Sequence, residues 1–226
     1  MGLLDEIREQ PASLERTIGE NGPVYADVAR SFSGCTHVVI AARGTSDNAA
    51  RYAQYVWGIR NRLAVSLTTP SLFSLYRRPP ALSGALIVGI SQSGQSPDIV
   101  SVLEEGRRQG RPRVAITNDP DSPLADAADI VVPLNTGPEL AVAATKTYTA
   151  QLAVISAISE AITGVSAGVA ELPALAARAL TTDDQAGTAA GRLVDVEHAA
   201  VLGRGFNLAT AFEWALKMQE LSYVVA

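Results

Sequence analysis

The stretch ALIVGISQSGQSPD (residues 85–98) decides the fold, because a wholly apolar run passes directly into small hydroxyl and amide residues. An unbroken apolar run of this length is typical of a strand buried on both faces of a parallel sheet. Ser96, Pro97 and Asp98 then match the start of a helix, as N-cap, first-turn proline and first-turn acid. The stretch therefore predicts a strand, a polar loop and a helix in direct succession.

Helix capping explains the end of this stretch but leaves Ser91, Gln92 and Ser93 unexplained. Gly94 permits a tight turn that presents consecutive backbone N–H groups, and the serine hydroxyls are additional donors. In open parallel sheets, ligands bind at the carboxyl ends of the strands, near helix N-termini. We therefore expect this loop to hold a phosphate with hydroxyls and amides, without a lysine.

The same succession of strand, loop and helix repeats along the chain. Apolar runs predict strands at 37–42, 63–67, 85–90, 113–117 and 129–133, and helical spacing predicts helices at 47–59, 71–76, 96–109 and 146–163. Strands that alternate with helices form a mostly parallel sheet covered on both faces. The predicted fold class is α/β, with an open, doubly wound sheet.

The two ends of the chain depart from this pattern. Residues 5–31 predict two short helical pieces separated by 19–23, with a bend or restart at Pro11. Alanine-rich residues 165–192 predict a helical connector, after which 199–203 predicts one more strand and 209–225 one more helix. A lone strand and helix cannot form an α/β domain, so this last part is expected to begin a second, incomplete unit.

Composition excludes several classes of protein. The net charge of −5 and the lack of a basic run argue against nucleic-acid binding, and no apolar stretch is long enough to span a membrane. A single cysteine, Cys35, excludes an intrachain disulfide, and two histidines, His37 and His198, argue against a metal site. No signal peptide is visible, so a soluble cytoplasmic protein is expected.

A second polar loop, at Arg43-Gly44-Thr45-Ser46, also lies between a predicted strand and a predicted helix. Two such loops at strand ends of one sheet could converge on one ligand. The rival motif GRGFNL (residues 203–208) begins like a dinucleotide-binding loop, but Leu208 stands where the final glycine or alanine belongs. A dinucleotide site is therefore not expected.

Three motifs occur in the order seen in sugar isomerase (SIS) domains: RGTSDN at 43–48, SQSGQS at 91–96 and ELAVAATK at 139–146. Residues 6–11, EIREQP, resemble the opening of the isomerase half of the glutamine–fructose-6-phosphate aminotransferase family. Residues 203–205 and 215–223 resemble the start of the second SIS domain of that half. The resemblance implies a flavodoxin-like three-layer SIS fold, with a helical segment (1–34), a first SIS domain (35–165), a connector (166–198) and an incomplete second SIS domain (199–226).

The resemblance also implies roles for individual residues. Glu220 matches the acid/base that moves a proton between C1 and C2 of an open-chain sugar, a task suited to a carboxylate whose pKa is raised by burial. The family usually has serine at the position of Ala144, so one polar contact is missing there. The implied substrate-binding residues are Gly44, Thr45 and Ser46 near the sugar and phosphate, Ser91, Gln92, Ser93 and Ser96 at the phosphate, and Glu139, Val142 and Ala144 at the sugar.

Three charged residues allow alternatives. Glu220 lies three residues after Lys217, which lies four after Glu213, a spacing that also forms ordinary surface ion pairs. Lys146 fits either a solvent-exposed lysine at a helix start or a ligand-binding residue. Glu139 fits either a plain first-turn acid or a residue that binds sugar hydroxyls.

By resemblance, the expected function is an isomerase or amino-sugar-phosphate deaminase acting on an amino- or keto-hexose 6-phosphate, without metal or organic cofactor and as a homodimer. By the same resemblance, the chain is expected to lack the glutaminase domain of the family, and the ring-opening histidine and C-terminal lysine of the family lie beyond the position that matches Ala226. The alternative is a non-catalytic module that binds or senses a sugar phosphate.

Overall fold

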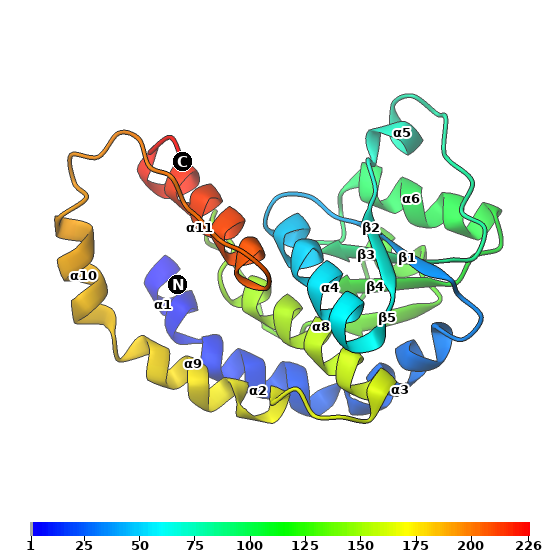
Figure 1. Cartoon of the computed structure of the whole chain (residues 1–226), viewed down its shortest axis with the longest axis horizontal. Helices are drawn as coiled ribbons and strands as arrows, with labels where there is room; N and C mark the ends of the chain where they lie inside the picture. The colour runs from blue at the N-terminus through cyan, green and yellow to red at the C-terminus, as the bar shows by residue number, and fades with distance from the viewer. Residues whose placement is uncertain (1) are drawn as a thin grey trace.

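The computed structural model describes residues 2–226 and confirms the predicted fold class. Five parallel strands form one sheet in the order β2-β1-β3-β4-β5 (Figure 1). They are β1 (His37–Ala41), β2 (Ala64–Leu67), β3 (Ala85–Ser91), β4 (Arg113–Thr117) and β5 (Ile130–Pro133). Each lies within two residues of its predicted bounds, because a strand buried on both faces gives a continuous apolar signal.

The strand order reverses between β1 and β3. From β1 the chain moves to β2 at one edge of the sheet, and from β3 it moves in the opposite direction to β4 and β5. Strands β1 and β3 are neighbours, and Ala41 at the end of β1 is in register with Gly89 of β3. The loops that follow β1 and β3 therefore leave the sheet side by side and in opposite directions. This topological switch point is where open α/β sheets bind ligands.

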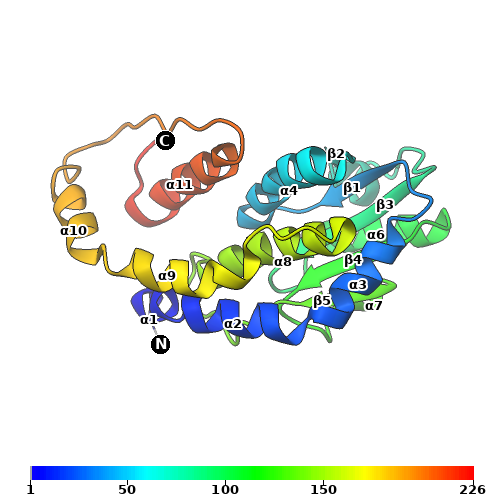
Figure 2. The ribbon, with the colours of Figure 1, turned by 60° about the horizontal axis from the view of Figure 1, so that its bottom comes forward.

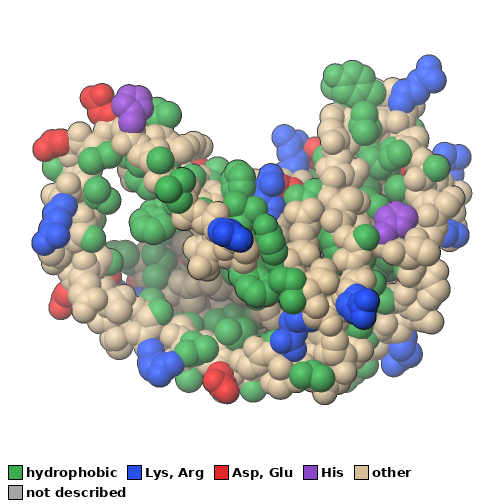
Figure 3. All heavy atoms as spheres, in the orientation of Figure 1, with side chains coloured by type: hydrophobic (Ala, Val, Ile, Leu, Met, Phe, Trp, Pro, Cys, Tyr) green, Lys and Arg blue, Asp and Glu red, His purple; other side chains and the backbone are tan. Residues whose placement is uncertain are grey.

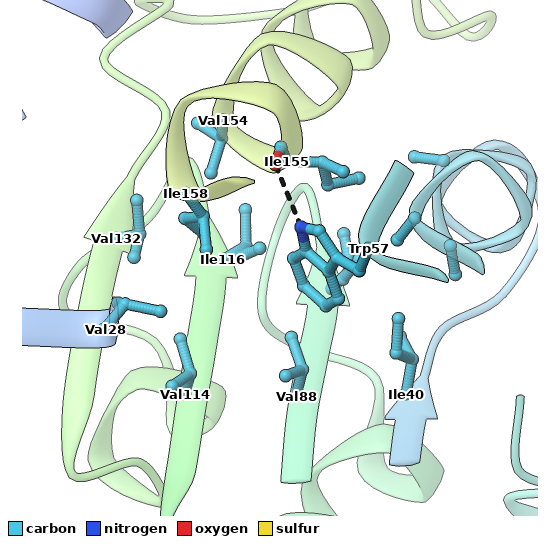
Figure 4. Close-up of a cluster of buried hydrophobic side chains, with 14 of the residues drawn as sticks. Val28, Ile40, Trp57, Val88, Val114, Ile116, Val132, Val154, Ile155 and Ile158 are labelled. Carbon is cyan, nitrogen blue, oxygen red and sulfur yellow. Dashed lines mark hydrogen bonds between the residues drawn. The ribbon is translucent and has the colours of Figure 1, made fainter. Parts of the chain in front are cut away.

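Helices cover both faces of the sheet. One face packs against α3 (Gly22–Ser31), α4 (Thr45–Asn61) and α8 (Lys146–Thr163), and the other against α5 (Ser71–Ser74), α6 (Pro97–Arg108) and α7 (Pro123–Asp126). Figure 4 shows Trp57 of α4 between the sheet and α8, where its indole N–H donates to the carbonyl of Ile155 at 3.0 Å. The result is a three-layer sandwich whose central layer is the sheet.

The N-terminal region forms three helices where the sequence predicted two. Helix α1 (Leu3–Arg8) ends before α2 (Gln10–Glu20), so the expected restart near Pro11 is confirmed. The proline lies in the first turn of α2, where its missing N–H is not needed. The predicted break over 19–23 was too wide, because only Asn21 separates α2 from α3.

After α8 the chain forms an arch of η1 (Val169–Glu171), α9 (Leu172–Leu180) and α10 (Asp183–Gly191), and returns through α11 (Asn207–Ser222) to pack against α4. Figures 1 and 2 show α10 standing apart from the sheet. The strand predicted at 199–203 is wrong: a single parallel bridge joins His198 to Val225, because no neighbouring strand within residues 2–226 is placed to pair with this segment. The assignment of 199–226 to a second domain stays a prediction. None of the helices within residues 2–226 has the length and apolar character needed to cross a membrane.

Candidate phosphate- and sugar-binding site

The two polar loops predicted to converge do meet at the switch point. Arg43, in the loop between β1 and α4, forms an ion pair of 2.7 Å with Asp98 in the first turn of α6. This pair ties the loop after β1 to the helix that follows the loop after β3. The carboxyl edge of the sheet therefore carries both candidate loops next to each other.

Hydrogen bonds anchor one side of the Ser91–Ser96 loop to the segment that follows β4. The carbonyl of Gln92 accepts from the amide of Asn118 at 3.0 Å and from the hydroxyl of Thr117 at 3.3 Å. The carbonyl of Gly94 accepts from the amide of Leu124 at 3.1 Å. Two carbonyls of the loop are thus held from one side.

The serine hydroxyls of this loop keep their donor protons available. Ser91 Oγ accepts from the amide of Gly94 at 3.1 Å, and Ser93 Oγ accepts from the amide of Gln95 at 3.3 Å. Ser96 lies at the predicted N-cap, but its hydroxyl makes no capping bond. Within residues 2–226 none of the three hydroxyl protons has an acceptor. Such donors, at the positive end of α6, are suited to an anion.

The loop after β1 is built differently, because the hydroxyl proton of Thr45 is already donated to a carboxylate. Thr45 donates to Glu213 Oε1 at 3.0 Å, and buried Ser46 accepts from the side-chain amide of Gln151 at 3.0 Å. The carboxylate of Glu213 thus occupies the N-terminus of α4. A second anion there would be repelled by this carboxylate, whereas no carboxylate of residues 2–226 bonds to the serine hydroxyls of the Ser91–Ser96 loop.

Glu213 is the central residue that the sequence interpretation missed. Its side chain is 9% exposed and accepts from Asn48 Nδ2 at 2.8 Å as well as from Thr45, which anchors α11 to the start of α4. Lys217 Nζ lies 3.3 Å from Glu213 Oε1 and 2.7 Å from Glu220 Oε2. The spacing of the three residues had suggested only surface ion pairs, and no local signal shows that Glu213 is buried against another helix.

A buried tyrosine on α8 flanks this cluster. Burial, then the carboxylate of Glu213 and then Tyr52 raise the pKa of the Tyr148 phenol, so the group stays a hydroxyl. Its oxygen has no hydrogen-bond partner within residues 2–226. Tyr148 is thus a buried phenol whose proton is uncommitted in this part of the molecule.

Glu220 lies at the outer end of the cluster formed by Glu213, Lys217 and Glu220. Its side chain is 37% exposed, and its contact with Lys217 connects it through Glu213 to Thr45. A groove of about 480 Å³ separates α4 from α11 beside it. Hydrophobic side chains gather where these two helices adjoin (Figure 3). The groove is lined by Gly44, Asp47, Asn48, Val201, Ala211, Phe212, Ala215, Leu216, Gln219 and Ala226.

The predicted sugar-contacting segment lies at the start of α8. Val142 is 97% exposed and Ala144 is half-buried. Glu139 accepts from the amides of Thr145 and Thr147 at 2.8 and 3.3 Å, so its carboxylate is bonded to the first turn of α8. The solvent-exposed interpretation of Lys146 is wrong: its side chain is 1% exposed and its Nζ lies 2.5 Å from Glu9 Oε2.

The parallel sheet in this order, with a serine-rich loop at its switch point, is compatible with an SIS domain. The family model for the SIS domain matches residues 31–161, and the chain belongs to this family. It is 32% identical, over 99% of its length and 40% of the relative's, to glutamine–fructose-6-phosphate aminotransferase of Bradyrhizobium diazoefficiens. The chain therefore spans about two fifths of the curated relatives it matches.

Solved structures agree with this assignment. The C-terminal domain of glucosamine-fructose-6-phosphate aminotransferase from Francisella tularensis matches with a TM-score of 0.86 and 30% identity, over 98% of this chain and 67% of that chain. A candidate phosphosugar isomerase of Silicibacter pomeroyi matches with a TM-score of 0.89 and 32% identity, over 97% and 68%. These relatives are described as acting on phosphosugars, and the chemistry of the Ser91–Ser96 loop is compatible with such a ligand.

Replacing Glu213 with glutamine is expected to loosen α11 and to lower the free energy of unfolding by about 1–3 kcal/mol, because Lys217 loses a counter-charge and an amide NH₂ faces the donor of Asn48 or Thr45. Hydrogen exchange of α11 amides and thermal unfolding measure the change. Glu171→Gln, at an exposed position in η1, is the matched control. Unchanged exchange in α11 would show that Glu213 does not anchor the helix.

Proposed function

We propose that this chain binds a hexose 6-phosphate, with the phosphate in the Ser91–Ser96 loop and the reacting carbons near Glu220. The observation that supports the proposal most directly is the set of uncommitted serine donors at the switch point of the sheet. Further contacts are assigned to Gly44, Thr45 and Ser46 on one side and to Glu139, Val142 and Ala144 on the other. The printed activities of the relatives support the same ligand class.

In this proposal Glu220 transfers the proton of an aldose–ketose isomerisation. With open-chain glucosamine 6-phosphate, the carboxylate removes the C2 proton while the C1 carbonyl oxygen takes a proton from water, and an enolamine forms. Return of the proton from Glu220 to C1 gives the C2 iminium ion, and the addition of water at C2 then releases ammonia and fructose 6-phosphate. Lys217 Nζ, 2.7 Å from Glu220 Oε2, holds the carboxylate in position. A homodimer in the cytoplasm is the expected setting.

A non-catalytic phosphosugar sensor is the second candidate. The ion pair between Lys217 and Glu220 favours it, because two residues with a purely structural role on a helix surface form the same contact. In that case the phosphate loop would work as described, while the carboxylate would only orient α11. The two candidates share the ligand and differ in the role of Glu220.

Replacing Ser93 with alanine removes one donor from the loop and is expected to weaken fructose 6-phosphate binding by about 10–100-fold, the value of one charge-assisted hydrogen bond. Isothermal titration calorimetry of the wild type and the variant measures the change. Ser74→Ala, at an exposed position on α5, is the control and leaves the affinity unchanged. A wild type that binds no phosphosugar refutes the proposed function, and an unaltered affinity in Ser93→Ala moves the phosphate out of this loop.

A further inference from the structure

A row of polar side chains runs along one side of α1 and α2 and lies mostly buried. It recurs at helical spacing, against the expectation that the inner side of a helix is apolar. Glu6, Ser13 and Thr17 are fully buried, and Asn21 is 2% exposed. We call this row the polar stripe; its members are Glu6, Glu9, Ser13, Arg16, Thr17 and Asn21.

The C-terminal half of the polar stripe donates to carbonyls of the chain that leaves β5. Asn21 Nδ2 donates to the carbonyl of Pro133 at 2.7 Å, and the hydroxyl of Thr17 donates to that of Leu134. Arg16 donates to the carbonyls of Asn135 and Thr136, both at 3.1 Å, and Ser13 donates to that of Thr136 at 3.4 Å. Four successive carbonyls are therefore held from one side by α2.

The N-terminal half of the polar stripe accepts hydrogen bonds, and its donors lie further along the segment that follows β5. The buried carboxylate of Glu6 accepts from the amide of Leu140 at 2.5 Å and from that of Ala141 at 3.2 Å. Glu9 Oε2 lies 2.5 Å from Nζ of Lys146, the first residue of α8. Carboxylates that accept backbone N–H bonds in a buried setting form strong, charge-assisted contacts.

The polar stripe and the segment 133–146 run in opposite directions. Residues 21, 17, 13 and 6 of the stripe meet residues 133, 134, 136 and 140 in turn. Figure 2 shows α2 extending beneath α8, against which it packs. Because the contacts are to the backbone, the side chains of Leu140 and Val142 stay free and project into solvent. Apart from the ion pair of Glu9 with Lys146, the stripe thus holds this segment by its backbone.

We propose that Glu6 and Glu9 are positioning residues of the ligand site. They hold the backbone at 140–141 and the start of α8, and so fix where Val142 and Ala144 stand relative to the Ser91–Ser96 loop. Helix α1 and the start of α2 then contribute to the geometry of the site, although neither touches the ligand. The role towards the ligand rests on the proposed function, whereas the tether itself does not.

The first test uses Glu6→Gln, in which an amide NH₂ faces at least one of the two backbone N–H groups. Amide exchange at Leu140 and Ala141 is expected to accelerate, and the fructose 6-phosphate Kd to rise about tenfold, as for one lost charge-assisted bond. Inorganic phosphate affinity is expected to stay unchanged, because the Ser91–Ser96 loop is untouched. Glu15→Gln, exposed on α2, is the matched control, and Glu6→Asp should recover part of the affinity.

The outcomes separate the tether from the proposed function. Unchanged exchange at 140–141 overturns the tether. Faster exchange with unchanged fructose 6-phosphate affinity overturns the positioning role. A wild type that binds no phosphosugar overturns the proposed function and with it the positioning role, while faster exchange in Glu6→Gln still supports the tether.

The second test uses the ion pair between Glu9 and Lys146, in case Glu6→Gln does not fold. Glu9→Gln leaves the buried lysine without its counter-charge, and stability is expected to fall. Glu9→Gln combined with Lys146→Met removes both charges and should restore the melting temperature. Fructose 6-phosphate affinity that stays several-fold weaker in the double variant supports the positioning role, and affinity that returns to the wild-type value overturns it for Glu9.

Discussion

Substituting alanine for Gly94 is expected to abolish phosphosugar binding and to lower the free energy of unfolding by roughly 2–4 kcal/mol. The residue has a φ of +64°, and an added Cβ would lie 2.0 Å from Ser122 Oγ and 3.1 Å from Thr117 Oγ1. Ser122 is fully buried and caps α7 by accepting from the amide of Ala125, so it cannot move aside without cost. The Ser91–Ser96 loop must therefore shift and lose its alignment of donors.

Gly110→Ala separates this effect from the ordinary strain of a positive φ. Gly110 has a φ of +65°, and an added Cβ would meet no atom of residues 2–226 within 4 Å, so its replacement should cost only about 1–2 kcal/mol. Thermal unfolding and titration with fructose 6-phosphate measure both variants. Gly94→Ala with wild-type affinity would show that the loop conformation does not hold the ligand.

The layers of the fold could be predicted because their signals are local. The run at 85–91 is buried on every residue, and such strands are visible without knowledge of their neighbours. The failed strand at 199–203 shows the limit: its residues are apolar, but a strand exists only when another strand is placed to bond with it. Propensity alone could not supply that partner.

The candidate site likewise contains residues that the sequence could reveal and residues that only the structure reveals. The serines at 91–96 were found because a turn needs fewer polar residues than that loop contains. Glu213, Lys146 and Glu6 were not recognised as buried, because each is buried by an element far away in the chain. A charged residue at helical spacing looks the same in solvent and against a second helix, so only the tertiary structure distinguishes them.

Glu220→Gln is expected to reduce turnover by about 10²–10⁴-fold, the usual contribution of a general acid/base. The amide can still accept a hydrogen bond from Lys217 but cannot take up the C2 proton. Affinity for fructose 6-phosphate should change by less than about tenfold, since a partly exposed ion pair contributes under ~1 kcal/mol. Ammonia release from glucosamine 6-phosphate by the encoded protein, together with calorimetric binding, measures the two effects separately.

The two candidate functions differ in the turnover expected of the wild type, because they place different demands on one carboxylate. An acid/base must exchange a proton with the ligand, so its amide analogue binds and does not turn over. A structural ion pair only needs an acceptor for Lys217, which glutamine retains, so a sensor would bind equally well and show no turnover even in the wild type. Glu104→Gln, at an exposed position on α6, controls for loss of surface charge. Wild-type turnover that persists in Glu220→Gln would exclude Glu220 as the acid/base, while the phosphate loop and the anchor at Glu213 would stand unchanged.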